Sequence, residues 1–272
     1  MALTHFISTV WSETMSSQMD KKYIAVANCN RDFEGDIKNR GDRVKICGVG
    51  DINVFDYTKN ADFDNAAQEL TSSLKTLVID QAKAFNFQID DVERAQTNPK
   101  LMDAAVRNAA AALANTADRY VFSLCEKAGD SIAASANISN VISLIIDART
   151  KLLKNNVCDP GDIVVEVSPD VSNLILKSKI NTSNEDTALE TGCIGTIAGC
   201  KVYVSNNIIV KDGVHKCLVR SKRAIAFAEQ LSEMDAYRPE KRFADAVKGL
   251  HLYGAEVIYP TEMVRLDLTV AA

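Results

Sequence analysis

The stretch that decides the fold is NCNRDFEGDIKNRGDRVKICGVGDINVFDYTKNADF, residues 28–63. Between Arg31 and Asp62 it carries six basic and seven acidic side chains, so the charges nearly cancel although the segment is densely ionic. Alternating runs at 44–46 and 52–54 flank a glycine-rich turn, a pattern that predicts a long β-hairpin. Because a two-stranded ribbon with so little apolar surface is at best marginally stable alone, we expect it to lie on another surface.

The composition excludes several classes of protein. The chain has 272 residues, enough for one large domain or two small ones, and 47% of them are hydrophobic, as in ordinary globular proteins. A net charge of −5 and a pI near 5.3 leave no basic stripe for sequence-specific nucleic-acid binding. No apolar run of about 18 residues predicts a membrane span, and the N-terminus does not resemble a secretory signal.

The cysteine pattern indicates reduced thiols rather than a disulfide framework or a zinc site. The seven cysteines are widely spaced, and none forms a Cys-x-x-Cys pair or has a histidine at zinc-ligand spacing. We therefore expect buried free thiols, as in a protein made in a reducing compartment.

An amphipathic helix is predicted at the N-terminus, before the charged stretch. Phe6, Ile7, Val10, Trp11 and Met15 recur at near-helical spacing within a polar segment. This helix could pack on its own domain or belong to an arm that reaches a neighbour, and the residues alone leave both readings open.

A long helix follows two strand-like runs, at Leu74–Ile79 and Ala84–Ile89. Asn98 is placed as an N-cap with proline at the first helical position, and neither proline nor glycine interrupts residues 99–128 before Gly129 supplies the stop. A helix of about thirty residues is well over twice the usual length. It predicts a spine for the first lobe.

The rest of the chain alternates helical and strand patterns. From Gly129 to Gln230 a helix over Ile138–Leu153 and a short helix begun by Pro169 lie among strands, which predicts an α/β lobe. The small, polar stretch GDSIAASANIS at its start is interpreted as a domain junction. The predicted strands after it are DIVVEVSP, KVYVSNNI, HKCLVRS and AIAFAEQ. We expect the two C-terminal strands, VKGLHLYGAEVIYP and MVRLDLTV, to rejoin the sheet of the first lobe.

No motif for catalysis or for binding a cofactor or metal is found. The three histidines, His5, His215 and His251, stand in no catalytic pattern, and the glycine-rich run GCIGTIAG lacks the Gly-Lys-Ser/Thr ending of a phosphate loop. We therefore predict no catalytic, cofactor or metal residues, and a protein that is not an enzyme. The alternative is a soluble α/β enzyme with a scattered active site, which would form a small defined oligomer with a deep polar pocket.

The order of several phrases resembles a known family over nearly the whole chain. These phrases are HFISTVWSETM, ANCNRDFEGDIKNRGDRVKI, FNFQIDDVERAQ, the long helix, GTIAGCKVYVSNNI and VKGLHLYGAEVIYPTEMV. Together they resemble the major capsid proteins of tailed bacteriophages with the Hong Kong 97 fold. The resemblance implies an α+β fold with an N-terminal arm, an extended β-hairpin loop, a peripheral lobe containing the spine helix, and an axial α/β lobe.

The parts of that fold can be placed on this sequence. The resemblance implies an arm at 1–31, an extended loop at 32–62, a peripheral domain at 63–128 and 236–272 with its spine helix at 99–128, and an axial domain at 129–235. In that family the extended loop lies over an adjacent subunit, which agrees with the expectation that this ribbon needs another surface.

The function that the resemblance implies is structural. Many copies would self-assemble as hexamers and pentamers of an icosahedral shell around the double-stranded DNA of a tailed phage, assembled in the host cytoplasm and found in the virion capsid. A separate scaffolding protein and a portal would be partners, DNA contacts would not be sequence-specific, and no membrane would be involved. An encapsulin-like compartment that packages a cargo enzyme is the alternative with the same fold.

Contacts between subunits are expected from the arm and the loop. The candidate residues are Trp11, Glu34, Asp36, Lys38, Arg40, Asp42, Arg43, Lys45 and Asp56. Some relatives weld subunits through a lysine and an asparagine in this loop, but nothing marks such a reaction here, and we expect plain ion pairing.

Overall fold

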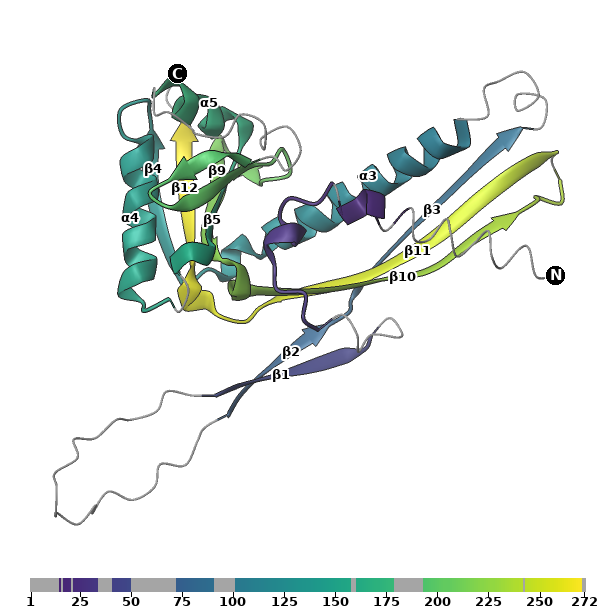
Figure 1. Ribbon diagram of the computed structural model, residues 1–272, viewed down its shortest axis with the longest axis horizontal. Helices are drawn as coiled ribbons and strands as arrows, with labels where there is room; N and C mark the ends of the chain where they lie inside the picture. The colour runs from purple at the N-terminus through teal and green to yellow at the C-terminus, as the bar shows by residue number, and fades with distance from the viewer. Residues whose placement is uncertain are drawn as a thin grey trace, which may run out of the picture.

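The computed structural model describes residues 15, 17–20, 22–33, 41–49, 72–90, 101–157, 160–178, 193–241 and 243–270. Figure 1 shows three parts: an elongated lobe built on a long sheet and a long helix, a globular lobe beside one end of it, and a two-stranded ribbon that runs away from both. The mixed α+β architecture predicted from the sequence is confirmed.

The elongated lobe is a three-stranded antiparallel sheet with one helix along it. Its strands lie in the order β10 (Ile225–Tyr237), β11 (Ala244–Val257) and β3 (Gln81–Asp90). Helix α3 (Leu101–Ser123) continues into the 3-10 turn η3 (Leu124–Lys127), so the expected spine helix is present.

Small residues let the spine helix approach its sheet closely. Ala110, Ala114 and Ala117 are fully buried at helical spacing, and they pack in one cluster with Phe227 of β10 and Tyr253 of β11. A helix with apolar residues on one face buries that face against the sheet and leaves the other in solvent.

The globular lobe contains a seven-stranded mixed sheet in the order β4-β12-β9-β5-β7-β6, with β8 paired to β9. The strands are β4 (Asp130–Ala136), β5 (Ile163–Val167), β6 (Cys193–Ile197), β7 (Cys200–Val204), β8 (Val210–Lys211), β9 (Val214–Ser221) and β12 (Met263–Val270). Helices α4 (Val141–Lys154) and α5 (Pro169–Lys177) pack in the same core cluster as this sheet. Short 3-10 turns connect the elements: η1 (Val26–Asn28), η4 (Pro160–Asp162), η5 (Lys222–Ala224) and η6 (Pro260–Glu262).

Local signals set the start of α5. The Ser168 hydroxyl accepts a hydrogen bond from the Val171 backbone N–H, and Pro169 occupies the first turn, where its missing N–H leaves no lost bond. The helix therefore begins where the sequence predicts it.

The last strand lies in a different sheet from the one expected. Strand β12 pairs with β4 and β9 in the globular lobe, whereas the sequence analysis returns residues 236–272 to the first lobe. Val264, Leu266 and Leu268 alternate on β12 and are fully buried in the core under α4 and α5. An alternating pattern shows which face a strand buries, but it does not show which sheet the strand joins.

Two further segments also differ from the expectation. β10, expected in the α/β lobe, forms an edge of the three-stranded sheet. β4, interpreted as a polar junction, is a seven-residue strand parallel to β12. Its burial alternates between exposed and half-buried positions, which is why its composition suggested a loop.

The ribbon pairs β1 (Arg43–Val49) with β2 (Ser72–Val78) in antiparallel register, from Arg43 opposite Val78 to Val49 opposite Ser72. The predicted first strand is confirmed. The second strand predicted near 52–54 lies outside the described residues, and the described partner of β1 is the run that the sequence analysis assigned to the first lobe.

No helix in the described part of the chain is long and apolar enough to cross a membrane.

Candidate functional site

The base of the ribbon is fixed to the back of the three-stranded sheet. Val44, Ile46 and Leu77 are buried in a cluster with Ala228 of β10 and Leu252 of β11. This cluster lies on the sheet face opposite the spine helix, since Leu252 alternates with Tyr253 along the strand. The ribbon therefore has a packed root on its own subunit, and β1 and β2 lead away from that root (Figure 1).

A glycine allows the ribbon to cross this sheet in close contact. A Cβ atom on Gly254 would lie 2.2 Å from the backbone oxygen of Val78. The ribbon's entry is closed by two backbone hydrogen bonds, Gly41 N–H to the Ile79 oxygen at 2.8 Å and Ile79 N–H to the Asp42 oxygen at 3.1 Å. Position 254 must therefore lack a side chain for β2 to lie where it does.

The predicted contact residues divide into two groups. Arg43 and Lys45 are exposed on the ribbon face opposite its packed residues, and Asp42 is half-buried at its entry. Their contact with another subunit stays a prediction. The other candidates lie outside the described residues: Trp11, Glu34, Asp36, Lys38, Arg40 and Asp56.

The base of the N-terminal arm is anchored by a carboxylate of the spine helix. Asp118, fully buried in α3, accepts backbone hydrogen bonds from Ile24 at 3.0 Å and from Ala25 and Val26 at 3.1 Å. Burial raises the pKa of Asp118 to about 6, although the three N–H donors oppose that rise. The side chain acts as a cap for the turn η1 at long range, because it satisfies N–H groups that the turn itself leaves unpaired.

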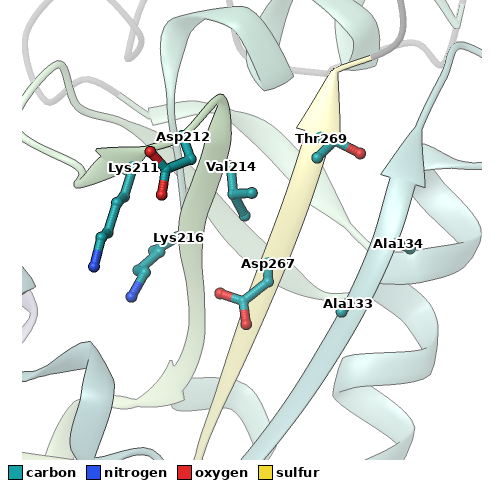
Figure 2. A pocket seen from close by; sticks show the side chains of 8 residues that line it. All are labelled: Ala133, Ala134, Lys211, Asp212, Val214, Lys216, Asp267 and Thr269. Atoms are coloured by element: carbon teal, nitrogen blue, oxygen red, sulfur yellow. The ribbon is translucent and has the colours of Figure 1, made fainter.

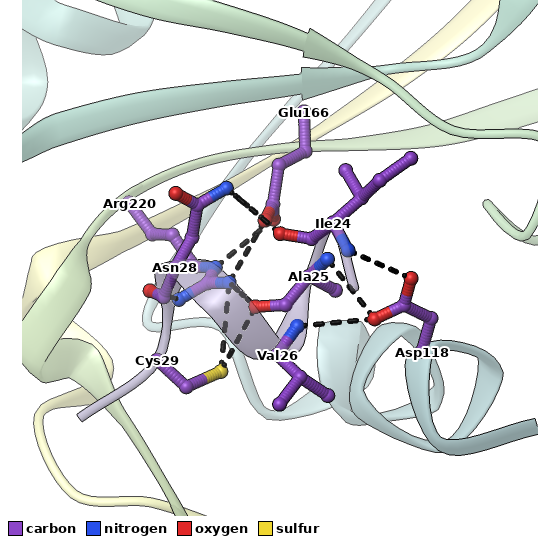
Figure 3. A network of polar contacts seen from close by, with 8 residues as sticks. All are labelled: Ile24, Ala25, Val26, Asn28, Cys29, Asp118, Glu166 and Arg220. Atoms are coloured by element: carbon purple, nitrogen blue, oxygen red, sulfur yellow. Dashed lines mark hydrogen bonds and ion pairs between the residues drawn. The ribbon is translucent and has the colours of Figure 1, made fainter. Parts of the chain in front are cut away.

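A buried ion pair fixes the same segment to the globular lobe (Figure 3). Arg220 of β9 binds Glu166 of β5 through two bonds, Nε to Oε2 at 3.0 Å and Nη2 to Oε1 at 2.8 Å, and both side chains are fully buried. Arg220 also donates to the backbone oxygens of Asn28 at 2.7 Å and Ala25 at 3.0 Å. One guanidinium thus joins two strands of the globular lobe to the arm.

Two arm side chains complete this network. The amide of Asn28 donates to the Ile24 oxygen at 3.0 Å and to Glu166 Oε1 at 3.4 Å. Cys29 lies 3.7 Å from Arg220 Nη2, and burial raises the pKa of its thiol to about 11. A thiol with this pKa is protonated at neutral pH and is a poor nucleophile, so the cluster is built to hold position.

A second charged cluster holds the arm against the elongated lobe. Glu229 of β10 accepts hydrogen bonds from Tyr23, from Arg31 at 2.7 Å, and contacts His251 Nε2 at 2.8 Å. Burial alone would raise the pKa of Glu229, but the bonds from His251 and Tyr23 and the charge of Arg31 hold it below its usual value. Arg31 also pairs with Asp20 at 2.9 Å.

These contacts hold the arm and the ribbon in position. Within the described ranges, no group of three or more histidine, cysteine or acidic side chains could hold a metal ion. Cys29, Cys125, Cys200 and Cys217 are buried free thiols, as the sequence predicts for these four.

Sequence reasoning missed Asp118, Glu166 and Arg220. The ion pair joins positions 54 residues apart, and Arg220 reaches an arm oxygen 192 residues away. The available signal was a charge inside each of two largely buried strands: Glu166 in IVVEV, and Arg220 in VHKCLVRS, which also carries Lys216. A charged residue in a strand that is otherwise buried requires a buried partner.

Comparisons with known proteins agree with this geometry. Residues 74–266 match a family model described as phage capsid protein. A structure from Mycobacterium phage Che8 has 28% sequence identity and a TM-score of 0.70, with 90% of each chain covered. No curated protein matches the chain.

Two other solved structures share the fold at low identity. The capsid of Ralstonia phage GP4 has 9% identity and a TM-score of 0.71, covering 93% of this chain and 91% of that one. The mature capsid of bacteriophage PhiM1 has 13% identity and a TM-score of 0.67, covering 91% and 87%.

Proposed function

Because this chain belongs to the phage capsid protein family, we propose that it is the major capsid protein of a tailed phage. Many copies self-assemble into an icosahedral shell, as hexamers and pentamers, around packaged double-stranded DNA. The role is structural rather than enzymatic.

One observation carries the proposal. The ribbon runs away from the lobes and is held at its base by Val44, Ile46 and Leu77, and the described part of the arm is held by Asp118 and Arg220. Ordering a segment costs about 1–2 kcal/mol of backbone entropy per residue. Packing the base of the ribbon on its own subunit orders that part of the chain during folding. Less conformational entropy is then lost when the ribbon binds the next subunit.

The assignment of residues to domains follows from the fold family. We assign residues 1–31 to the arm, 32–78 to the extended loop with its two ribbon strands, 79–128 and 225–257 to the peripheral domain, and 129–224 to the axial domain. The pairing of β12 with β4 and β9 adds residues 263–270 to the axial sheet.

The charged residues of the loop set register and partner choice. Exposed pairs are worth only about 0–1 kcal/mol each, so a single contact of Arg43 or Lys45 is weak and reversible. A closed shell repeats each contact many times. Assembly is therefore cooperative while single errors remain correctable.

The partners beyond the chain itself are inferred from the role. A separate scaffolding protein guides assembly in the host cytoplasm, and a portal provides the opening for DNA. DNA contact is independent of sequence, since the acidic chain offers no basic reading element.

Electron microscopy of the purified, overexpressed chain tests the proposal, with and without the candidate scaffolding protein of the same genome. Uniform closed shells are expected. A discrete dimer or tetramer that forms shells under neither condition would refute it. Shells that contain a cargo enzyme in place of DNA in the native setting would favour the compartment alternative.

A further inference from the structure

Three passages of the chain join the two lobes at one waist. They are the links from η3 to β4, from β9 through η5 to β10, and from β11 through η6 to β12. Backbone hydrogen bonds tie these passages together: Gly129 N–H donates to the Pro260 oxygen at 2.9 Å, and Ile258 N–H donates to the Ala224 oxygen at 2.8 Å. Two bodies that are joined at one waist can turn about it unless other contacts fix the angle between them.

The described part of the arm contacts both lobes (Figures 1 and 3). Val26 and Cys29 of the arm are buried in one apolar cluster with Ala114 of the spine helix and Leu218 of β9. The arm therefore fills space between the peripheral and axial domains, and it does not lie on the surface of one of them alone.

One residue of the arm is held by both lobes at once. The Ala25 N–H donates to Asp118 Oδ1 of the spine helix at 3.1 Å, and the Ala25 carbonyl accepts from Arg220 Nη2 of β9 at 3.0 Å. Ala25 is fully buried. Because a charged side chain holds each side of this residue, Ala25 cannot move away from either lobe without breaking a strong hydrogen bond.

The attachments continue along the arm on both sides. After Ala25, the Asn28 carbonyl accepts from Arg220 of the axial domain at 2.7 Å. Asn30 then joins β10 of the peripheral domain in a parallel bridge, in which its N–H donates to the Ile225 oxygen at 2.9 Å. The bonds of the arm therefore alternate between the two domains.

Two other polar contacts between the lobes lie at the surface. Asn207, after β7, bonds Arg119 at 3.1 Å and Asn115 at 3.0 Å, both on the spine helix. Lys216 of β9, which lines the cleft shown in Figure 2, pairs with Glu126 of η3 close to the waist. Exposed contacts of this kind are weak, so they resist a change of angle less than the buried bonds of the arm do.

We propose that residues 23–31 of the arm act as a strap that sets the angle between the peripheral and axial domains, and that release of the strap lets the two domains turn about the waist. The inference concerns a single subunit and does not depend on shell assembly. It gives the arm a role beyond contact with a neighbour. A partner that displaces the arm also changes the shape of the subunit, and the domain angle in turn affects where the arm lies.

Arg220→Met combined with Glu166→Leu releases the strap from the axial domain and leaves neither partner of the buried pair charged. The carbonyls of Ala25 and Asn28 then lose their charged donor. An arm that is held on one side only opens more often. Amide hydrogen exchange at Ala25 should therefore accelerate by at least about tenfold, the factor expected for loss of a hydrogen bond to a charged group.

Pulsed electron spin resonance on unassembled subunits measures the angle. Nitroxide labels on non-natural ketone side chains at Asn108 of the spine helix and Leu176 of α5, both exposed, leave the native cysteines untouched. The wild-type subunit should give one narrow distribution of label distances, and the double variant should give a broader and shifted one. A released arm with an unchanged distribution would overturn the proposal.

Asp118→Ala releases the strap from the peripheral domain instead, and it should broaden the same distribution. Asn207→Ala is the matched control, because it removes only the exposed bonds to Asn115 and Arg119. It should leave the distribution as in the wild type. An equal broadening from Asn207→Ala would show that any contact between the lobes sets the angle, and the strap would then have no special role.

Near-ultraviolet circular dichroism and urea unfolding show whether the strap variants keep both lobes. Folded variants with a broadened distribution support the strap. If neither strap variant folds, the arm is part of one common core rather than a strap between two lobes, and the proposal fails. If both fold and the amide of Ala25 stays as protected as in the wild type, these bonds do not hold the arm, and the proposal fails as well.

Discussion

The buried ion pair of Arg220 and Glu166 joins two strands at a high cost in desolvation free energy. Each ion costs several kcal/mol to remove from water, and the attraction between them offsets this cost only when the remaining polar atoms also have partners. Here the arm supplies those partners, through the backbone oxygens of Ala25 and Asn28. The pair is therefore best understood as a device that places the arm in one position, rather than as a source of stability.

Arg220→Met should destabilise the unassembled subunit by about 3–5 kcal/mol, because it leaves a buried carboxylate at Glu166 without its partner. Urea unfolding of the subunit measures the change. Arg220→Met combined with Glu166→Leu is the control, and it should recover a large part of the loss, since no unpaired charge remains. A single variant as stable as the wild type would contradict the role given to the pair.

Asp118 should make the subunit less stable as pH rises from about 4 to about 6. Burial raises its pKa to about 6 in the folded chain, from 3.8 as the ordinary value. In that window the folded state binds more protons than the unfolded state, so the unfolding free energy falls with rising pH and is flat above it.

Asp118→Asn tests this by removing the titrating group while keeping an oxygen acceptor for Ala25 and Val26. The difference in unfolding free energy, wild type minus variant, should decrease across the window when measured by urea titration at fixed pH values. A difference that grew with pH there would show that the pKa of Asp118 lies below, not above, its unfolded value.

At the scale of elements, the ribbon depends on one close approach. Gly254→Ala would place a Cβ within 2.2 Å of the Val78 backbone oxygen, a contact that backbone atoms cannot relieve without moving β2. Such overpacking typically costs about 1–3 kcal/mol. We expect faster amide hydrogen exchange in β1 and β2, and a lower yield of shells.

Gly161→Ala is the matched control, since a Cβ at that position meets no atom within 4 Å. It should leave both the exchange of the ribbon amides and the shell yield unchanged. If Gly254→Ala also left them unchanged, the ribbon root would not depend on this approach.

The elements show what a sequence can and cannot predict. The spine helix and α5 were predictable because their signals, a run without proline or glycine and a Ser-Pro start, act within a few residues. The sheet that receives β12 and the partner of β1 were not, because strand pairing joins residues far apart and alternation is the same in either sheet.

The candidate site was predictable only in part, because a sequence shows where charges lie but not which distant residues they contact. The loop charges stand out as a dense ionic segment, and Arg43 and Lys45 are exposed as that reading requires. The anchors Asp118, Glu166 and Arg220 are buried charges. Their partners are defined only by the folded chain.

At the scale of the whole molecule, the proposed shell would be held by several weak contacts from each subunit. We propose that the arm and the ribbon each bind a neighbour weakly, and linked weak contacts give a combined affinity far above any one of them. Removing one class of contact should therefore stop closure of the shell without unfolding the subunit.

Replacement of residues 51–70 by Asn-Gly tests this most directly. The variant retains β1 and β2, the packed root at Val44 and Leu77, and both lobes, so its unfolding free energy should stay within about 0.5 kcal/mol of the wild type. It should lose the proposed contacts between the loop and the adjacent subunit. Sedimentation velocity should then detect subunits and at most ring-sized oligomers, and electron microscopy should find no closed shells. Shells of normal size from this variant would show that the loop is dispensable and that the lobes alone drive assembly.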